Sequence, residues 1–118
     1  MAVKIVPKDE MVNAVGTTYP PGEWILVDQD RINTFADCTE DHQFIHVDKE
    51  KAAKTPFGTT VAHGFLTLSL LSKMVENNGV VPENLVMGLN YGFDKVRFLA
   101  PVKSGKRIRA NAEVTDVT

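Results

Sequence analysis

The sequence lacks the features of several protein classes. Cys38 is its single cysteine and cannot close an intrachain disulfide. A domain of 118 residues can bury enough apolar surface to fold without one, so a reducing compartment is expected. The first eight residues lack the uninterrupted apolar run of a secretory signal. We therefore expect a cytoplasmic protein.

The sequence also lacks a long apolar run and an excess of one charge. Its longest stretch without a formal charge, 55–72, contains a proline, two glycines, a histidine and four threonines, so it is too polar to span a bilayer. The formal net charge is −2, so neither nucleic acid nor a membrane is expected as a partner. Residues 91–118 nevertheless carry six basic and three acidic side chains, which suits a local anionic ligand.

The composition is that of one globular domain, with 43% hydrophobic and 24% charged residues. No internal repeat, low-complexity tract or linker divides the chain. We expect a single domain over residues 1–118.

In the first half of the chain, capping residues and apolar spacing predict two short helices. Asp28 caps a helix that follows a short strand over 23–27, and Asp48 caps a second helix over 49–54. The segment 39–47 between the helices shows neither period and is predicted to be a loop.

The second half predicts one long helix followed by two strands. Apolar residues cover most of the circumference of the helix over 62–77, which indicates burial on nearly all sides, and Asn77, Asn78 and Gly79 supply its stop. Strands are predicted over 90–99 and 106–117, the latter with alternating apolar and polar residues. Such a helix against one side of an antiparallel sheet is an α+β domain.

Two short motifs indicate the chemistry. The first runs from Phe35-Ala36 to Asp41-His42-Gln43-Phe44-Ile45-His46, and the second, Ala62-His63-Gly64, opens the long helix. Together they resemble the MaoC-like dehydratases, the R-specific enoyl-CoA hydratases of the hotdog fold, and most of all their nodulation-protein-N-like branch. The resemblance covers roughly residues 20–118. It implies a long central helix wrapped by a curved antiparallel sheet.

The resemblance also implies an activity and its residues. The family adds water to a trans-2-enoyl-CoA to give an (R)-3-hydroxyacyl-CoA, and it runs the reverse dehydration. Asp41 would take the proton of the water, and His46 would orient the same water and assist the transfer; how the two share the proton is open. Gly64 matches the glycine whose N–H forms the oxyanion hole. Acyl-CoA is then the substrate, no further cofactor is needed, and a homodimer is expected.

The chain departs from the family's usual Gly-Asp-x-Asn-Pro-Leu-His. Glu40, Gln43 and Phe44 replace the glycine, the asparagine and the proline, which preserves the catalytic pair and leaves the acyl specificity open. We expect Gln43, Phe44, His63 and Ser72 to contact the substrate. A purely structural imidazole is the favoured alternative for His63, and a serine bonded back to a helix carbonyl is an equal one for Ser72.

The family usually has two further strands after the one that ends at Thr118. We therefore expect the last strands of the hotdog to be missing from this chain or to be completed by another chain.

A metal site is a further alternative. His42 and His46 are four residues apart, with three aspartates nearby, Asp37, Asp41 and Asp48. Because a predicted loop does not bring positions i and i+4 together, no metal is expected.

Other polar residues have simpler interpretations. Cys38 is expected to be a small buried residue rather than a nucleophile. Four basic residues near the C-terminus could contact the phosphates of coenzyme A: Lys103, Lys106, Arg107 and Arg109. Charged residues on the solvent-exposed face of a strand are also common without any ligand. Two alternative functions stay open, a hotdog acyl-CoA thioesterase and a non-catalytic acyl-CoA binding module.

Overall fold

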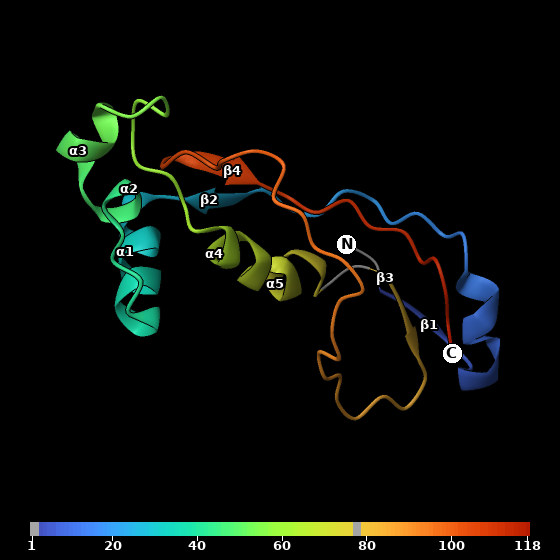
Figure 1. Ribbon diagram of the computed structural model, residues 1–118. Coiled ribbons are helices and arrows are strands. Elements are labelled where there is room, and N and C mark those ends of the chain that lie inside the picture. Colours follow the sequence, from blue (N-terminus) through green and yellow to red (C-terminus); the bar gives the residue numbers. More distant parts are fainter. Residues whose placement is uncertain (1–2, 77–78) are drawn as a thin grey trace. The chain divides into compact units, whose positions relative to one another are not determined.

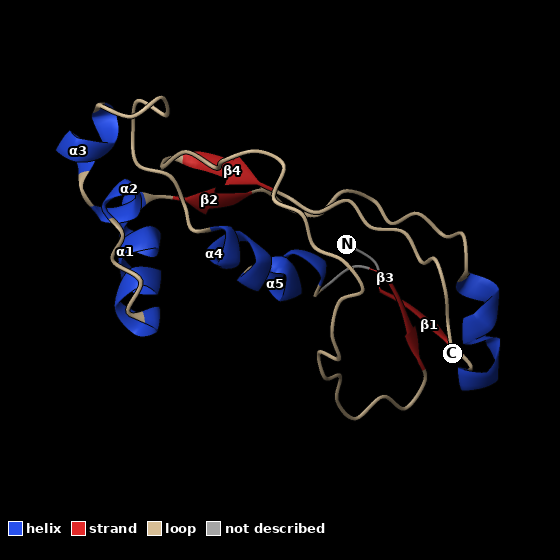
Figure 2. Ribbon diagram, viewed as in Figure 1, coloured by secondary structure: helices blue, strands red, loops and turns tan. Residues whose placement is uncertain are grey.

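The computed structural model, drawn in Figure 1, describes residues 3–76 and 79–118. The chain divides into two compact units. We call them the central unit, Trp24–Leu71 with Arg97–Ile108, and the terminal unit, which holds Met1–Glu23, Ser72–Val96 and Arg109–Thr118. Helices, strands and loops of both are distinguished in Figure 2.

The central unit begins with a strand and a capped helix. Strand β2 (Ile25–Val27) leads into α1 (Gln29–Thr39), and Asp28 Oδ1 accepts a hydrogen bond from the N–H of Arg31 at 3.0 Å. Both the strand and the N-cap are as predicted. The helix ends at Glu40, whose φ of 62° lies in the left-handed region.

The segment between α1 and the next predicted helix is not all loop. Residues Phe44–Val47 form one helical turn, α2, closed by a hydrogen bond from the N–H of Asp48 to the carbonyl of Phe44 at 2.9 Å. A single turn is too short to show a helical period, so the prediction of a loop over 39–47 was wrong there. Asp48 then caps α3 (Lys49–Ala53) by accepting from the N–H of Lys51 at 3.0 Å, as predicted.

A small core holds these elements together. Strand β2 pairs antiparallel with β4 (Lys106–Ile108), with Ile25 opposite Ile108. The buried residues of the core come from β2, α1, the segment before the helix Gly64–Ser69 and that helix itself: Val27, Ile32, Ala62 and Leu66. Four partly buried side chains pack against them: Phe35, Leu70, Val102 and Ile108.

The predicted long helix is interrupted. It consists of α4 (Gly64–Ser69) and α5 (Leu71–Val75), with Leu70 between them. Burial is also less than predicted, because the core covers one face of α4: Leu66 is buried, whereas Phe65 is 67% exposed. The predicted stop at Asn77 and Asn78 lies outside the described residues.

The terminal unit contains a parallel strand pair and an antiparallel ribbon. Strand β1 (Val3–Val6) pairs with β3 (Gly79–Pro82), and the 3-10 helix η1 (Lys8–Ala14) follows β1. The backbone of 109–118 runs along residues 16–22, for example through the N–H of Tyr19 and the carbonyl of Ala112 at 2.8 Å. Side chains there alternate between half-buried and exposed, but the strand predicted over 106–117 is formed only over Lys106–Ile108, because beyond it the strand pairing among the described residues includes only an isolated bridge, between Thr18 and Glu113.

The strand predicted over 90–99 is absent, and every residue of this segment is exposed. A strand needs a hydrogen-bonded neighbour, and no part of 3–76 or 79–118 pairs with this segment in a ladder. Within the same described ranges, no helix has the length and hydrophobicity needed to cross a membrane.

Candidate active site

The central unit brings together three side chains of the two predicted motifs. A carboxylate oxygen of Asp41, a ring nitrogen of His46 and a ring nitrogen of His63 all lie within 4.8 Å of one another. Asp41 follows the end of α1, His46 belongs to α2, and His63 immediately precedes α4. The histidines are 7% and 3% exposed, while the side chain of Asp41 is 52% exposed. The cluster is therefore open to solvent on its carboxylate side.

The surroundings of His46 define its tautomer. Its Nδ1 lies 2.7 Å from the carbonyl oxygen of Val61. Because a carbonyl oxygen can only accept, Nδ1 carries the hydrogen, and the Nε2 of the neutral ring holds the lone pair. The N–H of Val61 donates in turn to the carbonyl of Ile45 at 3.0 Å. This reciprocal pairing ties α2 to the segment that leads into α4.

His63 is bonded in the opposite sense. Its Nε2 donates to the main-chain carbonyl of Asp41 at 3.0 Å, so the lone pair of the neutral ring lies on Nδ1. That Nδ1 is buried without a hydrogen-bond partner. The ring stacks on His46 with a centroid distance of 3.8 Å and packs tilted against Phe35 at 4.9 Å.

A second layer of polar residues supports the turn that carries His46. The side-chain amide of Gln29 donates to the carbonyl of His46 at 2.7 Å and to Oδ1 of Asn33 at 2.9 Å. The hydroxyl of Thr60, which is fully buried, donates to Oε1 of Gln29. Nothing in the sequence distinguishes Gln29 from an ordinary residue in the first turn of a helix, so sequence reasoning missed this support.

The cluster has the donor types of a metal site, but its geometry does not favour one. A histidine nitrogen binds a zinc ion at about 2.1 Å along its lone pair, which lies in the ring plane. The rings of His46 and His63 are nearly parallel, 23° apart, and 3.8 Å from each other, so one ion cannot lie in both planes. The grouping of His42 with His46 that the sequence offered does not form among the described residues: His42 bonds to Asp37 at 2.9 Å, and neither of them belongs to the cluster around His46.

Gly64 lies at the first position of α4, where no carbonyl of the helix can accept its N–H. A Cβ at this residue would lie 3.0 Å from the ring of Phe98. The space that glycine leaves is thus taken by Phe98, a constraint that the sequence did not reveal. A cavity of 200 Å³ adjoins Gly64, and it is lined by Ala62, Thr67 and residues 98–102.

The remaining residues predicted to contact substrate are dispersed. Gln43 is exposed and precedes α2, and Phe44 begins that helix with 42% of its surface exposed. Ser72 belongs to the terminal unit, where its Oγ accepts a hydrogen bond from Asn90 at 3.4 Å. The serine that bonds back to a helix carbonyl is Ser69, which donates to Phe65 at 2.6 Å.

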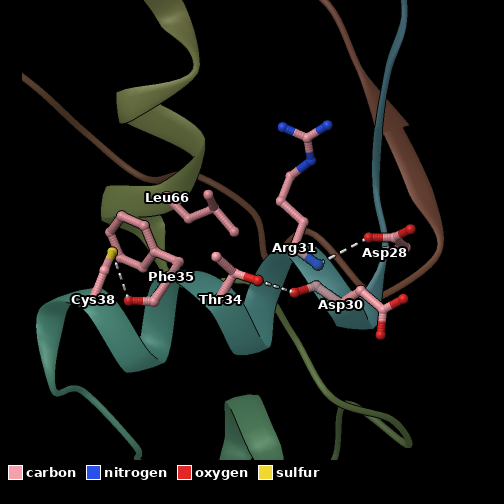
Figure 3. Close-up of a pocket in the computed structure, with 7 residues that line it drawn as sticks. All are labelled: Asp28, Asp30, Arg31, Thr34, Phe35, Cys38 and Leu66. Carbon is pink, nitrogen blue, oxygen red and sulfur yellow. Dashed lines mark hydrogen bonds between the residues drawn. The ribbon is translucent and has the colours of Figure 1, made fainter.

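A second cavity, of 430 Å³, lies between α1 and α4 (Figure 3). Phe35 and Leu66 line it together with Cys38 and polar residues at the start of α1. Cys38 is exposed, so the expectation of a buried cysteine was wrong: it lies in the last turn of α1 and lines this cavity instead of packing into the core. Its Sγ donates to the carbonyl of Phe35 at 3.4 Å.

The basic residues near the C-terminus are exposed, which fits the solvent-exposed face of a strand: Lys103, Lys106, Arg107 and Arg109. Their contact with coenzyme A stays a prediction.

Comparison with protein families gives one match over most of the chain. The model described as "MaoC like domain" matches residues 10–118. The chain is 54% identical over 101 residues to nodulation protein N of Rhizobium leguminosarum bv. viciae, which covers 85% of this chain. It is 44% identical over 108 residues to 3-hydroxyacyl-thioester dehydratase Z of Mycobacterium tuberculosis, which covers 92% of it. The chain spans 63% of the first relative and 71% of the second.

Comparison with solved structures identifies the fold. The (R)-hydratase from A. caviae involved in PHA biosynthesis superposes with a TM-score of 0.69 at 28% identity, over 88% of this chain and 74% of its own. The predicted α+β hotdog fold is thereby confirmed.

Proposed function

Because the chain belongs to the MaoC-like domain family and its relatives include dehydratases and hydratases, we propose that it is an R-specific enoyl-CoA hydratase. It adds water to a trans-2-enoyl-CoA to give an (R)-3-hydroxyacyl-CoA and catalyses the reverse dehydration. One observation carries this proposal. The carboxylate of Asp41 lies beside a buried His46 whose Nε2 is left to accept a hydrogen bond.

The gap between these two acceptors suits one water molecule. A carboxylate oxygen of Asp41 and a ring nitrogen of His46 lie no more than 4.8 Å apart, a separation that two hydrogen bonds of about 2.8 Å can bridge through one shared water oxygen. A water so held has both of its hydrogens engaged and a lone pair free. That is the orientation needed for attack on the β-carbon of an enoyl thioester.

The reaction then proceeds by general acid–base catalysis. Asp41 takes one proton from the water while His46 Nε2 holds the other O–H, and the water oxygen bonds to the β-carbon. Electrons move to the thioester oxygen, and the proton on Asp41 is delivered to the α-carbon. The carboxylate ends as it began, so neither an oxidant nor a cofactor is needed.

The thioester oxygen needs a donor while it carries negative charge. We assign this role to the N–H of Gly64, which has no intrahelical acceptor and belongs to a residue that lines the 200 Å³ cavity. The ring of Phe98 over Gly64 then forms one wall beside the reacting group. Gln43 and Phe44, at the exposed entrance to α2, remain the proposed contacts for the rest of the substrate.

The proposal is tested with crotonyl-CoA, whose absorbance falls when its double bond is hydrated. Asp41→Asn should lower kcat by about 10²- to 10⁴-fold, because the amide cannot take a proton. His46→Asn should cause a similar loss, since it removes Nε2, while its amide nitrogen can still donate to Val61 and preserve the fold. The matched control is His42→Asn, which alters an exposed histidine bonded to Asp37 and should leave the rate unchanged.

Free thiol is measured in the same reactions. Release of coenzyme A by the wild type would indicate a thioesterase instead. Binding of crotonyl-CoA without turnover, unaffected by Asp41→Asn, would indicate a non-catalytic binding module.

A further inference from the structure

Resting on the proposed function, we propose that His63 is the positioning residue of the site, which holds both Asp41 and His46 in place for the water between them. His63 contacts both residues directly. Its Nε2 donates to the main chain of Asp41, and its ring stacks on the ring of His46. It also immediately precedes Gly64 in the chain, so one residue adjoins all three parts of the proposed site.

The bond to Asp41 matters because the rest of that residue is loosely held. Asp41 lies outside any helix or strand, and its side chain is 52% exposed. Its carboxylate accepts a long hydrogen bond of 3.3 Å from the N–H of Gln43, two residues away. His63 is 22 residues away and 3% exposed, so its 3.0 Å bond anchors the peptide of Asp41 to the buried part of the unit. A shift of about 1 Å in a catalytic group costs about 10²-fold in rate.

The stack constrains the other partner. His46 is tied at its Nδ1 edge by the carbonyl of Val61, which fixes one point of the ring but not its rotation about that point. The face of His63 at 3.8 Å, itself supported by Phe35 at 4.9 Å, restricts that rotation. The edge bond and the stack together hold the Nε2 lone pair in one direction.

A purely structural role does not account for His63. Its Nδ1 is buried without a partner, and a buried polar atom without a hydrogen bond destabilises the folded state. An apolar side chain of similar volume would avoid this cost. The contacts of His63 to Asp41 and His46 give it a role that such an apolar side chain could not take over.

Two variants separate positioning from structure. His63→Leu removes the bond to Asp41, the stack and the unpaired nitrogen. It should lower kcat for crotonyl-CoA by about 10²-fold with little change in KM, while Tm stays equal or rises. His63→Gln retains an N–H at the same depth and should recover part of the lost kcat. His42→Leu, at the exposed histidine, is the matched control and should change neither quantity.

Several results would overturn the proposal. One is wild-type kcat in His63→Leu. Another is a parallel loss of kcat and Tm in His63→Leu that His63→Gln does not reduce, since this is the behaviour of a structural residue.

A readout independent of turnover is the ¹⁵N spectrum of the imidazole rings, in which protonated and lone-pair nitrogens are distinct. We expect the hydrogen of His63 on Nε2 and that of His46 on Nδ1, and in His63→Leu the His46 signals should broaden as its ring gains freedom. A hydrogen on Nδ1 of a neutral His63 would refute the bond to Asp41 and hence the proposal. If the wild type shows the expected tautomers but hydrates no enoyl-CoA, it is the proposed function that fails.

Discussion

Glu40 is a non-glycine residue with a left-handed backbone conformation. It ends α1 with a φ of 62°, a conformation that favours glycine, and it directly precedes Asp41. The family motif that the sequence resembles has glycine at this position. Glu40 therefore adopts a backbone conformation to which its side chain is poorly suited.

This predicts the effect of Glu40→Gly on stability. Relief of the left-handed strain is worth about 1 kcal/mol, partly offset by the greater freedom of glycine in the unfolded chain. The free energy of unfolding, measured by urea denaturation, should stay level or rise by up to about 1 kcal/mol. Glu50→Gly, within α3, is the control and should lower it by about 1 kcal/mol. Equal losses in both variants would contradict the strain at Glu40.

Several site residues were predictable because their chemistry is unusual for their position. The sequence placed Asp41, His46 and Gly64 in two motifs, and the structure brings Asp41 and His46 together with His63. The roles of Gln29 and Thr60 were not predictable, since a hydrogen bond across 31 residues depends on packing that no local pattern encodes.

At the scale of elements, α2 is one turn long and cannot be stable alone. The side chain of Gln29 holds it by accepting from Thr60 and donating to the carbonyl of His46. Short turns of this kind depend on tertiary contacts, which is why the sequence predicted a loop.

Replacing the buried hydroxyl tests this dependence. Thr60→Val preserves the shape of the side chain but leaves Oε1 of Gln29 without its donor, so the free energy of unfolding should fall by about 1–3 kcal/mol. Thr60→Ser should retain most of it. Thr34→Val removes an exposed hydroxyl bonded within α1 and should cost less than about 0.5 kcal/mol in the same urea titration. Identical results for Thr60→Val and Thr34→Val would show that the link contributes nothing.

Helices with an N-cap were predicted well, whereas features that depend on distant neighbours were not. Asp28 and Asp48 accept the predicted hydrogen bonds because an N-cap is satisfied within its own turn. The strand over 90–99 and the burial of the long helix depend on neighbours elsewhere, so apolar pattern alone could not establish them.

At the scale of the whole molecule, the exposed apolar side chains concentrate in one stretch of sequence. Residues 85–99 hold nine large ones: Leu85, Val86, Met87, Leu89, Tyr91, Phe93, Val96, Phe98 and Leu99. Exposure on this scale is typical of surfaces that associate.

We therefore expect the homodimer that the family resemblance implies. Sedimentation velocity should give a species of twice 13.0 kDa, and the double variant Leu89→Lys/Tyr91→Lys should shift it toward the monomer. Val12→Lys, at an exposed residue of η1, is the control and should not. A wild type that sediments as a monomer at all concentrations would refute the expectation.

The main chain of Val61 provides a measure of how the site opens. Its carbonyl accepts from His46, and its N–H, bonded to Ile45, can exchange with deuterium only when that bond opens. The lifetime of this single amide in heavy water thus records how often the helical turn of His46 separates from the strand-like segment before α4. Exchange at this one amide therefore reports on the integrity of the proposed site in the absence of substrate.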